Sequence, residues 1–170
     1  MKKMTSAYAN KIIKQLEEEK GYWITRERES MTYQATVDEE PFIPDYDYEA
    51  VSATLAGIDE KMRKIKHAIN LNNITNSVLV GDEMMTIDSI LIKMAQLNNR
   101  KSVLDMMRKQ LPKSRVNVAF YGKTTAMEYQ YVNYDLEKVK EDFEKISEEI
   151  VTMQIALDRY NQTYEFEVDI

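Results

Sequence analysis

The sequence predicts a mainly α-helical protein, an antiparallel bundle of long coiled-coil-like helices that carries a small β-hairpin element. In several segments apolar residues recur at alternating spacings of three and four residues, which places them on one face of a helix. Only four Gly and three Pro occur in 170 residues, so turns are few and an all-β sandwich or barrel is disfavoured. With 44% apolar and 31% charged residues, the composition indicates one globular helical domain over residues 1–170.

The first predicted helix covers about residues 5–29. Ser6 is a suitable N-cap, and Tyr8 and Ile12 mark the apolar side of this helix. After it, residues 31–37 alternate between apolar and other side chains as a strand does, so we expect an extended segment there.

The second predicted helix covers about residues 47–70. Asp47 is a suitable N-cap, and Glu49 lies in the first turn, where a negative charge interacts favourably with the helix dipole. One apolar seam runs along this helix and consists of Val51, Leu55, Ile58, Met62, Ile65 and Ile69.

The third predicted helix covers about residues 86–111, from the cap Thr86 to the residue before Pro112, which cannot continue a helix. Lys101 and Arg108 occupy two of its seam positions, where Leu would pack better. The seam as a whole consists of Ile87, Ile90, Met94, Leu97, Lys101, Leu104, Arg108 and Leu111.

The fourth predicted helix covers about residues 135–162 and begins at the cap Asp135. Extended segments are predicted in a hairpin over residues 116–131 and in the alternating tail, residues 164–170, with a further short strand and turn over residues 78–82. The seam of the fourth helix consists of Leu136, Val139, Phe143, Ile146, Ile150, Met153, Leu157 and Tyr160.

Charge is distributed unevenly along the chain. Residues 93–123 carry eight bases and one acid, a net +7, whereas residues 135–170 carry eleven acids and four bases, a net −7. In one interpretation, Asp142, Glu148 or Glu149 of the fourth helix neutralises the basic seam positions of the third helix. In the other, the basic segment faces a phosphate-bearing partner.

The basic, Tyr-rich end of the chain is the candidate surface for a ligand or partner. Tyrosines interleaved with Lys and Arg can stack on nucleic-acid bases, but they also pack small sheets against helices while their hydroxyls stay hydrated. The net charge of −6 disfavours non-specific nucleic-acid binding, so a nucleic acid or nucleotide is an unlikely ligand. The candidate residues are Lys101, Arg108, Lys113, Arg115, Lys123, Tyr121, Tyr129 and Tyr131.

Most catalytic chemistries are disfavoured by residue content. The absence of Cys excludes disulfides, thiolate catalysis and Cys-ligated metals, and the single His, His67, excludes a multi-His metal site. Residues 122–124 resemble the end of a phosphate-binding loop, but Asn117 stands where that motif needs Gly. We therefore expect no catalytic residue, no cofactor, no metal site and no enzyme activity.

The sequence also bears on location. A secretory signal is not apparent, and no apolar run approaches the roughly 20 residues that a membrane span needs. We expect a cytoplasmic protein without membrane association.

One stretch resembles a known family. Residues 64–70, the Asn-rich segment 73–76 and the helix that begins at Thr86 and contains Leu91 resemble a family of small, uncharacterised bacterial helical or coiled-coil proteins called septicolysin-like. The resemblance covers about residues 47–111. It implies a cytoplasmic coiled-coil protein of unestablished function and supplies no catalytic residues. Nothing in the sequence supports the lytic activity that the family name suggests.

These observations predict a non-catalytic interaction or assembly protein that forms a homo-oligomer or binds a protein partner through helical packing surfaces. Long seams on three helices offer more apolar surface than one thin bundle can cover. The alternative is an inhibitor, antitoxin-like or ligand-sequestering protein that binds a phosphate-bearing ligand or nucleic acid at its basic, Tyr-rich end.

Overall fold

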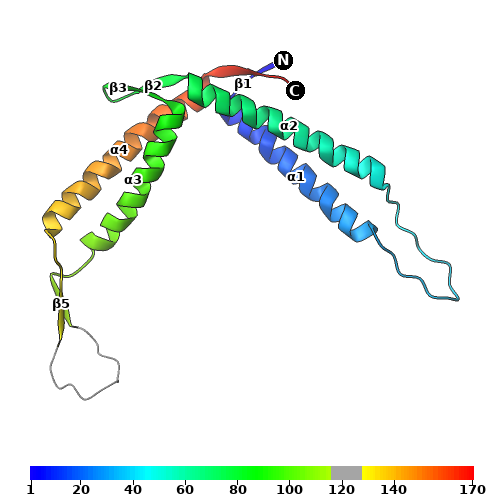
Figure 1. The fold of residues 1–170 in the computed structure, drawn as a ribbon, viewed down its shortest axis with the longest axis horizontal. Helices are drawn as coiled ribbons and strands as arrows, with labels where there is room; N and C mark the ends of the chain where they lie inside the picture. Colours follow the sequence, from blue (N-terminus) through cyan, green and yellow to red (C-terminus); the bar gives the residue numbers. More distant parts are fainter. Residues whose placement is uncertain (116–127) are drawn as a thin grey trace. The chain divides into compact units, whose positions relative to one another are not determined.

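A computed structural model describes residues 1–115 and 128–170 of the chain. Over these residues the protein is mainly helical, with four helices and three two-stranded sheets (Figure 1). Its contacts group the chain into two compact units. The first unit comprises residues 1–77 and 158–170, and the second comprises residues 78–157.

The first unit contains an antiparallel pair of long helices, α1 (Ser6–Ser30) and α2 (Tyr48–Thr75). The N-cap of α1 is Thr5 and not the predicted Ser6, because Thr5 has an extended backbone and its hydroxyl accepts a hydrogen bond from the Tyr8 N–H at 3.2 Å. Asp47 caps α2 as predicted, with a bond of 3.0 Å from the Ala50 N–H.

The apolar seam predicted for α2 faces the interior. Val51, Ile58 and Ile65 are buried, and the remaining seam residues are half-buried. The helix continues to Thr75, five residues beyond the predicted end. Residues 71–75 are helical, with Asn72 buried, and the helix ends where the Asn76 N–H bonds to the Asn72 carbonyl at 3.1 Å.

The predicted tail strand is β6 (Glu165–Val168), and it pairs antiparallel with β1 (Lys2–Thr5), which the sequence did not predict. Met4 stands opposite Phe166 in this ladder. Met4 and Val168 join a buried cluster with three helical residues, so the ladder covers the end of the α1–α2 core. These three helical residues are Ala9, Ile13 and Ile65.

Residues 31–37 form no strand. They belong to the connection between α1 and α2, and every residue from 31 to 40 is exposed. The alternation predicted an extended segment here, but no sheet forms. Alternation produces a strand only where another strand supplies hydrogen-bond partners.

The second unit begins with a hairpin of β2 (Ser77–Val80) and β3 (Glu83–Thr86). Gly81 has a φ of +59°, a left-handed conformation that favours Gly in so tight a turn. This is the short strand and turn predicted for residues 78–82. Thr86 then caps α3 (Ile87–Arg108) with a bond of 3.2 Å from the Ser89 N–H, as predicted.

The α3 helix ends at Arg108, three residues before the predicted end. The Gln110 N–H bonds to the Met107 carbonyl at 3.1 Å, which tightens the last turn, and Pro112 disfavours a helical conformation at Leu111. The chain then enters β4 (Lys113–Arg115).

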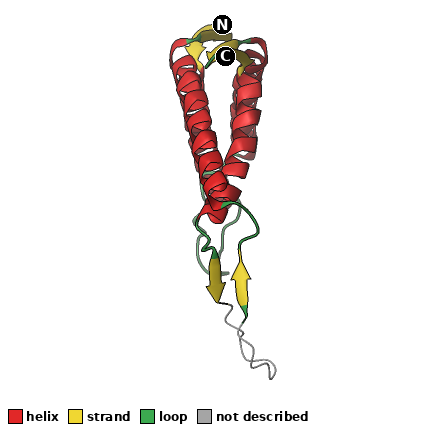
Figure 2. Cartoon of the chain, turned by 90° about the vertical axis from the view of Figure 1, so that its left-hand side faces the viewer, coloured by secondary structure: helices red, strands yellow, loops and turns green. Residues whose placement is uncertain are grey.

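The predicted hairpin is present at its base, where β4 pairs antiparallel with β5 (Tyr129–Tyr131). Residues 116–127 of the predicted hairpin lie outside the described part of the chain. Asp135 caps α4 (Leu136–Thr163) as predicted, through bonds of 2.9 Å from the Glu137 N–H and 3.2 Å from the Lys138 N–H. Figure 2 shows the β4–β5 pair beyond the ends of the α3 and α4 helices.

Candidate interaction site

Two cations of the α3 seam lie on an aromatic ring of α4. Arg108 is 3.9 Å and Lys101 is 5.3 Å from the centre of the Phe143 ring, a cation–π arrangement. The Arg108 guanidinium also donates two hydrogen bonds, of 2.9 and 2.7 Å, to the Asp105 carboxylate one turn earlier. Arg108 therefore takes its carboxylate partner from its own helix, and the contact of Lys101 with α4 is to a ring.

Two of the three acids that were expected to neutralise them have other partners. Asp142 pairs with Lys138 of its own helix at 3.2 Å, and Glu149 pairs with Lys93 at 2.7 Å. The Lys93–Glu149 contact is an ion pair that joins α3 to α4, and the hydrogen bond to Glu149 raises the pKa of Lys93. Lys101 and Arg108 thus contact the acidic helix through the ring of Phe143 and not through the carboxylates expected to neutralise them.

The β4–β5 pair holds a second cation against aromatic rings. The Lys113 ammonium lies 4.0 Å from the Tyr129 ring centre and 5.4 Å from the Tyr131 ring centre. Both rings belong to the facing strand, on which Tyr131 is the direct partner of Lys113 and Tyr129 that of Arg115. Of the candidate residues, the structure thus brings together Lys101 with Arg108 and Lys113 with the two tyrosines. Tyr121 and Lys123 lie outside the described residues.

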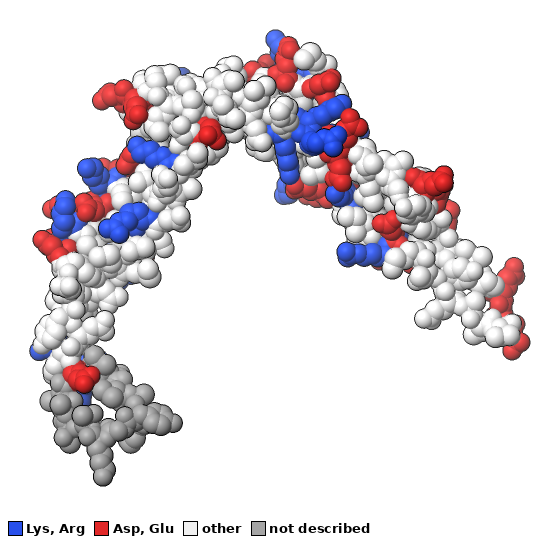
Figure 3. Space-filling model, in the orientation of Figure 1, with Lys and Arg blue, Asp and Glu red and all other residues white. Residues whose placement is uncertain are grey.

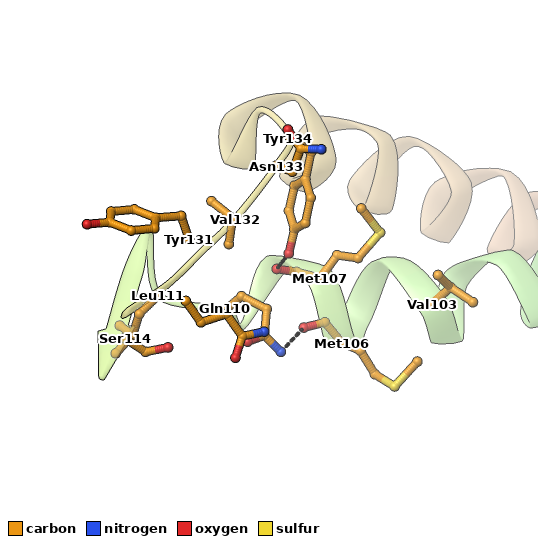
Figure 4. A pocket seen from close by; sticks show the side chains of 11 residues that line it. Val103, Met106, Met107, Gln110, Leu111, Ser114, Tyr131, Val132, Asn133 and Tyr134 are labelled. Carbon is orange, nitrogen blue, oxygen red and sulfur yellow. Dashed lines mark hydrogen bonds between the residues drawn. The ribbon is translucent and has the colours of Figure 1, made fainter. Parts of the chain in front are cut away.

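A pocket of about 330 Å³ lies where α3 ends and the hairpin begins (Figure 4). We call it the α3 pocket. Tyr134 closes one side and donates a hydrogen bond of 2.9 Å from its hydroxyl to the Met107 carbonyl. The pocket is lined by Val103, Met106, Met107, Gln110, Leu111, Ser114, Gln130, Tyr131, Val132, Asn133 and Tyr134.

The lining of the α3 pocket is apolar or uncharged. Met106, Leu111 and Tyr131 expose 60%, 65% and 62% of their surface, so large apolar side chains surround an open cavity. None of the described lining residues is basic. This chemistry suits a side chain or an uncharged peptide segment better than a phosphate, which needs free cationic or backbone donors.

The sequence also carries a signal for this site, a second row of residues on α3 that is separate from the seam. On the face of α3 away from the seam, uncharged residues recur at spacings of 4, 3, 4, 3 and 4. We call this row the α3 face, and it consists of Ile92, Gln96, Asn99, Val103, Met106 and Gln110. Its last three members line the α3 pocket.

The first unit has a cavity of its own, about 420 Å³ between α2 and β6, which His67, Asn72 and Tyr164 help to line. Asn72 is 5% exposed, and its side-chain oxygen accepts hydrogen bonds from the Tyr160 hydroxyl and the Asn76 amide, both at 3.0 Å. Burial raises the pKa of the Tyr160 hydroxyl, so this buried polar cluster is uncharged at neutral pH.

The described residues contain no group of three or more His, Cys, Asp or Glu side chains placed to hold a metal ion. No described helix is both long enough and apolar enough to cross a membrane.

Comparison with known proteins identifies a shared fold. No protein-family model matches the chain, and no curated protein matches it. A functionally unknown conserved protein from Corynebacterium diphtheriae, known from its crystal structure, is similar in fold, with a TM-score of 0.68 and 13% sequence identity. The match covers 98% of this chain and 100% of that protein, and at this identity the likeness concerns the fold alone.

Proposed function

We propose that this protein is a non-catalytic interaction protein of the cytoplasm that self-associates through the α3 face and the α3 pocket. The observation that carries the proposal is the uncharged row on an exposed side of α3. Five of its six members lie in the stretch of the chain that carries a net +7, residues 93–123, yet none of the six is charged.

The geometry of a helix supports this proposal. At 3.6 residues per turn, the α3 face points away from Ile90 and Leu104, which are buried in the second unit. Ile92, Val103 and Met106 expose 53%, 40% and 60% of their surface. Burying such side chains stabilises an interface by about 25 cal/mol per Å² of apolar surface, so a partner that covers the row gains free energy along several turns.

The polar members of the row fit a helical partner. An Asn among apolar positions, as at Asn99, is a common device by which coiled coils fix register and oligomer number. The coiled-coil bundle expected from the sequence is on this proposal completed between copies of the chain.

The alternative function, an inhibitor, antitoxin-like or ligand-sequestering protein for a phosphate-bearing ligand, has less support. Arg108 already has Asp105 and Phe143 as partners, and Lys113 lies on two tyrosine rings. A phosphate that binds there has to displace these contacts, and it gains correspondingly less free energy.

Replacing Val103 with Glu tests the proposal. We expect light scattering of the unaltered protein at micromolar concentration to give a multiple of the 20.0 kDa chain mass, and Val103→Glu to lower it to 20.0 kDa. Asn98→Glu is the matched control, because it adds the same charge to an exposed position of α3 about 140° around the helix. A mass of 20.0 kDa for the unaltered protein at every concentration contradicts the proposal.

A further inference from the structure

The connection between α1 and α2 carries an unusual combination of acidic and exposed apolar residues. We call residues 38–47 the acidic loop, since they include five acids and no base. Figure 3 shows acidic side chains at this end of the α1–α2 pair. Phe42 and Ile43, at the centre of the loop, expose 87% and 61% of their surface. Two adjacent apolar side chains this exposed, and rimmed by charges, offer surface that a partner can cover.

Several contacts order the loop before any partner binds. The Tyr46 hydroxyl donates a hydrogen bond of 2.8 Å to the Glu27 carboxylate of α1, and Thr36 donates one of 3.1 Å to Glu39. Pro41 and Pro44 stand on either side of the Phe42–Ile43 pair and fix their own φ angles. A segment that is already partly ordered loses less conformational entropy on binding.

The α3 pocket has the size and chemistry to receive this apolar pair. Its volume of about 330 Å³ is near the lower end of the range for ligand pockets, which suits one or two side chains. Met106 and Met107 in its wall are flexible and make favourable sulfur contacts with aromatic rings. The amides of Gln110 and Gln130 can bond to the backbone of a bound segment.

The charges of the two segments are complementary. Of the two segments that line the α3 pocket, residues 100–115 carry six bases and one acid and residues 128–138 carry one base and three acids, a net +3 together, whereas the acidic loop carries only acids. Opposite fields of this kind steer two surfaces together and disfavour the contact of each surface with its own kind.

We propose that Phe42 and Ile43 of the acidic loop of one copy occupy the α3 pocket of a second copy. This inference rests on the self-association put forward above and names the segment of the second copy that fills the pocket. The contact is heterologous, because each copy contributes a different surface to it.

A mixing experiment tests the inference. Phe42→Ala removes the apolar anchor and leaves the pocket intact, whereas Met106→Glu blocks the pocket and leaves the loop intact. Each variant alone should associate at least about tenfold more weakly than the unaltered protein, as expected for the central anchor of an interface. When the two variants are mixed, light scattering should show a complex of one copy of each, because one intact loop then meets one intact pocket.

Two controls and the possible outcomes make the test decisive. Val37→Ala removes another fully exposed apolar side chain of the same connection and should leave association unchanged, as should Asn98→Glu on α3. If Met106→Glu abolishes association and Phe42→Ala does not, the inference is wrong while the proposed function stands. A mixture in which both variants stay at 20.0 kDa also overturns the inference. If the unaltered protein never associates, both the inference and the proposed function are wrong.

The dependence of association on salt concentration is an independent test of the inference. About 1 M salt shortens the screening length to about 3 Å, so a contact guided by opposite charges should form more slowly and more weakly there. Association that is unchanged or stronger at high salt contradicts a role of the acidic loop and favours a purely apolar contact between α3 faces.

Discussion

Between α1 and α2 the space is filled by small and branched side chains, whereas the hairpin end of the α3–α4 pair is held by cations on an aromatic ring. Ala9 and Ile65 are fully buried in the first unit, where the two helix backbones lie close together. In the second unit Lys101 and Arg108 lie on the ring of Phe143. Seam positions of the same spacing are thus satisfied in two ways, by apolar packing in one pair and by cation–π contacts in the other.

The comparison of the two helix pairs shows how a helix can tolerate a charged residue at a seam position. A cation in a helix seam is usually expected to need a carboxylate from the facing helix. Here the planar guanidinium of Arg108 covers the Phe143 ring and keeps its hydrogen bonds with Asp105 on the same helix. The facing helix supplies an apolar surface with a negative ring face, and its acids remain available for other contacts.

The largest expected effect is in the close-packed pair. Ile65→Ala should lower the free energy of unfolding by about 2–5 kcal/mol, because Ile65 is 0% exposed and neighbouring side chains cannot fill the resulting cavity. Ile150→Ala on α4 should cost less than this, because Ile150 is only half-buried. Urea unfolding of both variants checks the difference, and equal losses would break the contrast between the two helix pairs.

A smaller effect is expected at the buried polar cluster of the first unit. Tyr160→Phe removes the hydroxyl that bonds to Asn72 at 3.0 Å and should cost about 1 kcal/mol. Tyr164→Phe is the matched control, because Tyr164 is 42% exposed and its hydroxyl can bond to water. Urea unfolding that shows the same loss for both variants would mean that the buried bond contributes nothing specific.

Replacing the two cations of the α3 seam is expected to leave the free energy of unfolding almost unchanged. Replacing both Lys101 and Arg108 with Leu exchanges exposed cation–π contacts for apolar packing, and stability should change by no more than about 1 kcal/mol. The association state should stay the same, because both residues lie on the side of α3 opposite the α3 face. Urea unfolding and light scattering of the double variant check this, and an altered association state would place these cations in the interface.

The smallest effect concerns pH. Hydrogen bonds from Lys109 and Arg108 lower the pKa of Asp105 below its ordinary value of 3.8. The stability contributed by the ionised carboxylate is therefore present above pH 3.8 and is lost as the pH falls through the lower folded-state pKa. Asp105→Asn should remove this acid-dependent loss, and comparing thermal unfolding of the two proteins from neutral to acidic pH measures it.

Much of the fold could be predicted because its signals are local. The seam spacing of α2 and the caps Asp47, Thr86 and Asp135 each depend on a few neighbouring residues, and all are confirmed. The β1 strand was missed because four residues that begin with two lysines show no alternation. Its existence depends on pairing with β6, which lies at the other end of the sequence.

The candidate site was predicted less well, for a related reason. The basic residues were recognised by charge, but charge alone does not reveal that Phe143 and Tyr129 serve as their partners. Leu111 was assigned to the helix seam, whereas the structure places it in the wall of the α3 pocket, 65% exposed. Which residues share a pocket depends on where α3 ends, and helix ends are less strongly encoded than helix faces.

The order in which the chain is made has a consequence for how the two units form. Residues 78–157 are continuous, whereas the first unit needs both residues 1–77 and the segment that begins at Asp158. During synthesis the second unit is thus complete before β6 exists, and the pairing of Lys2 with Val168 belongs to the last stage of folding. Prior folding of residues 78–157 roughly halves the flexible chain between β1 and β6, which lowers the entropic cost of closing that loop by about 0.6 kcal/mol.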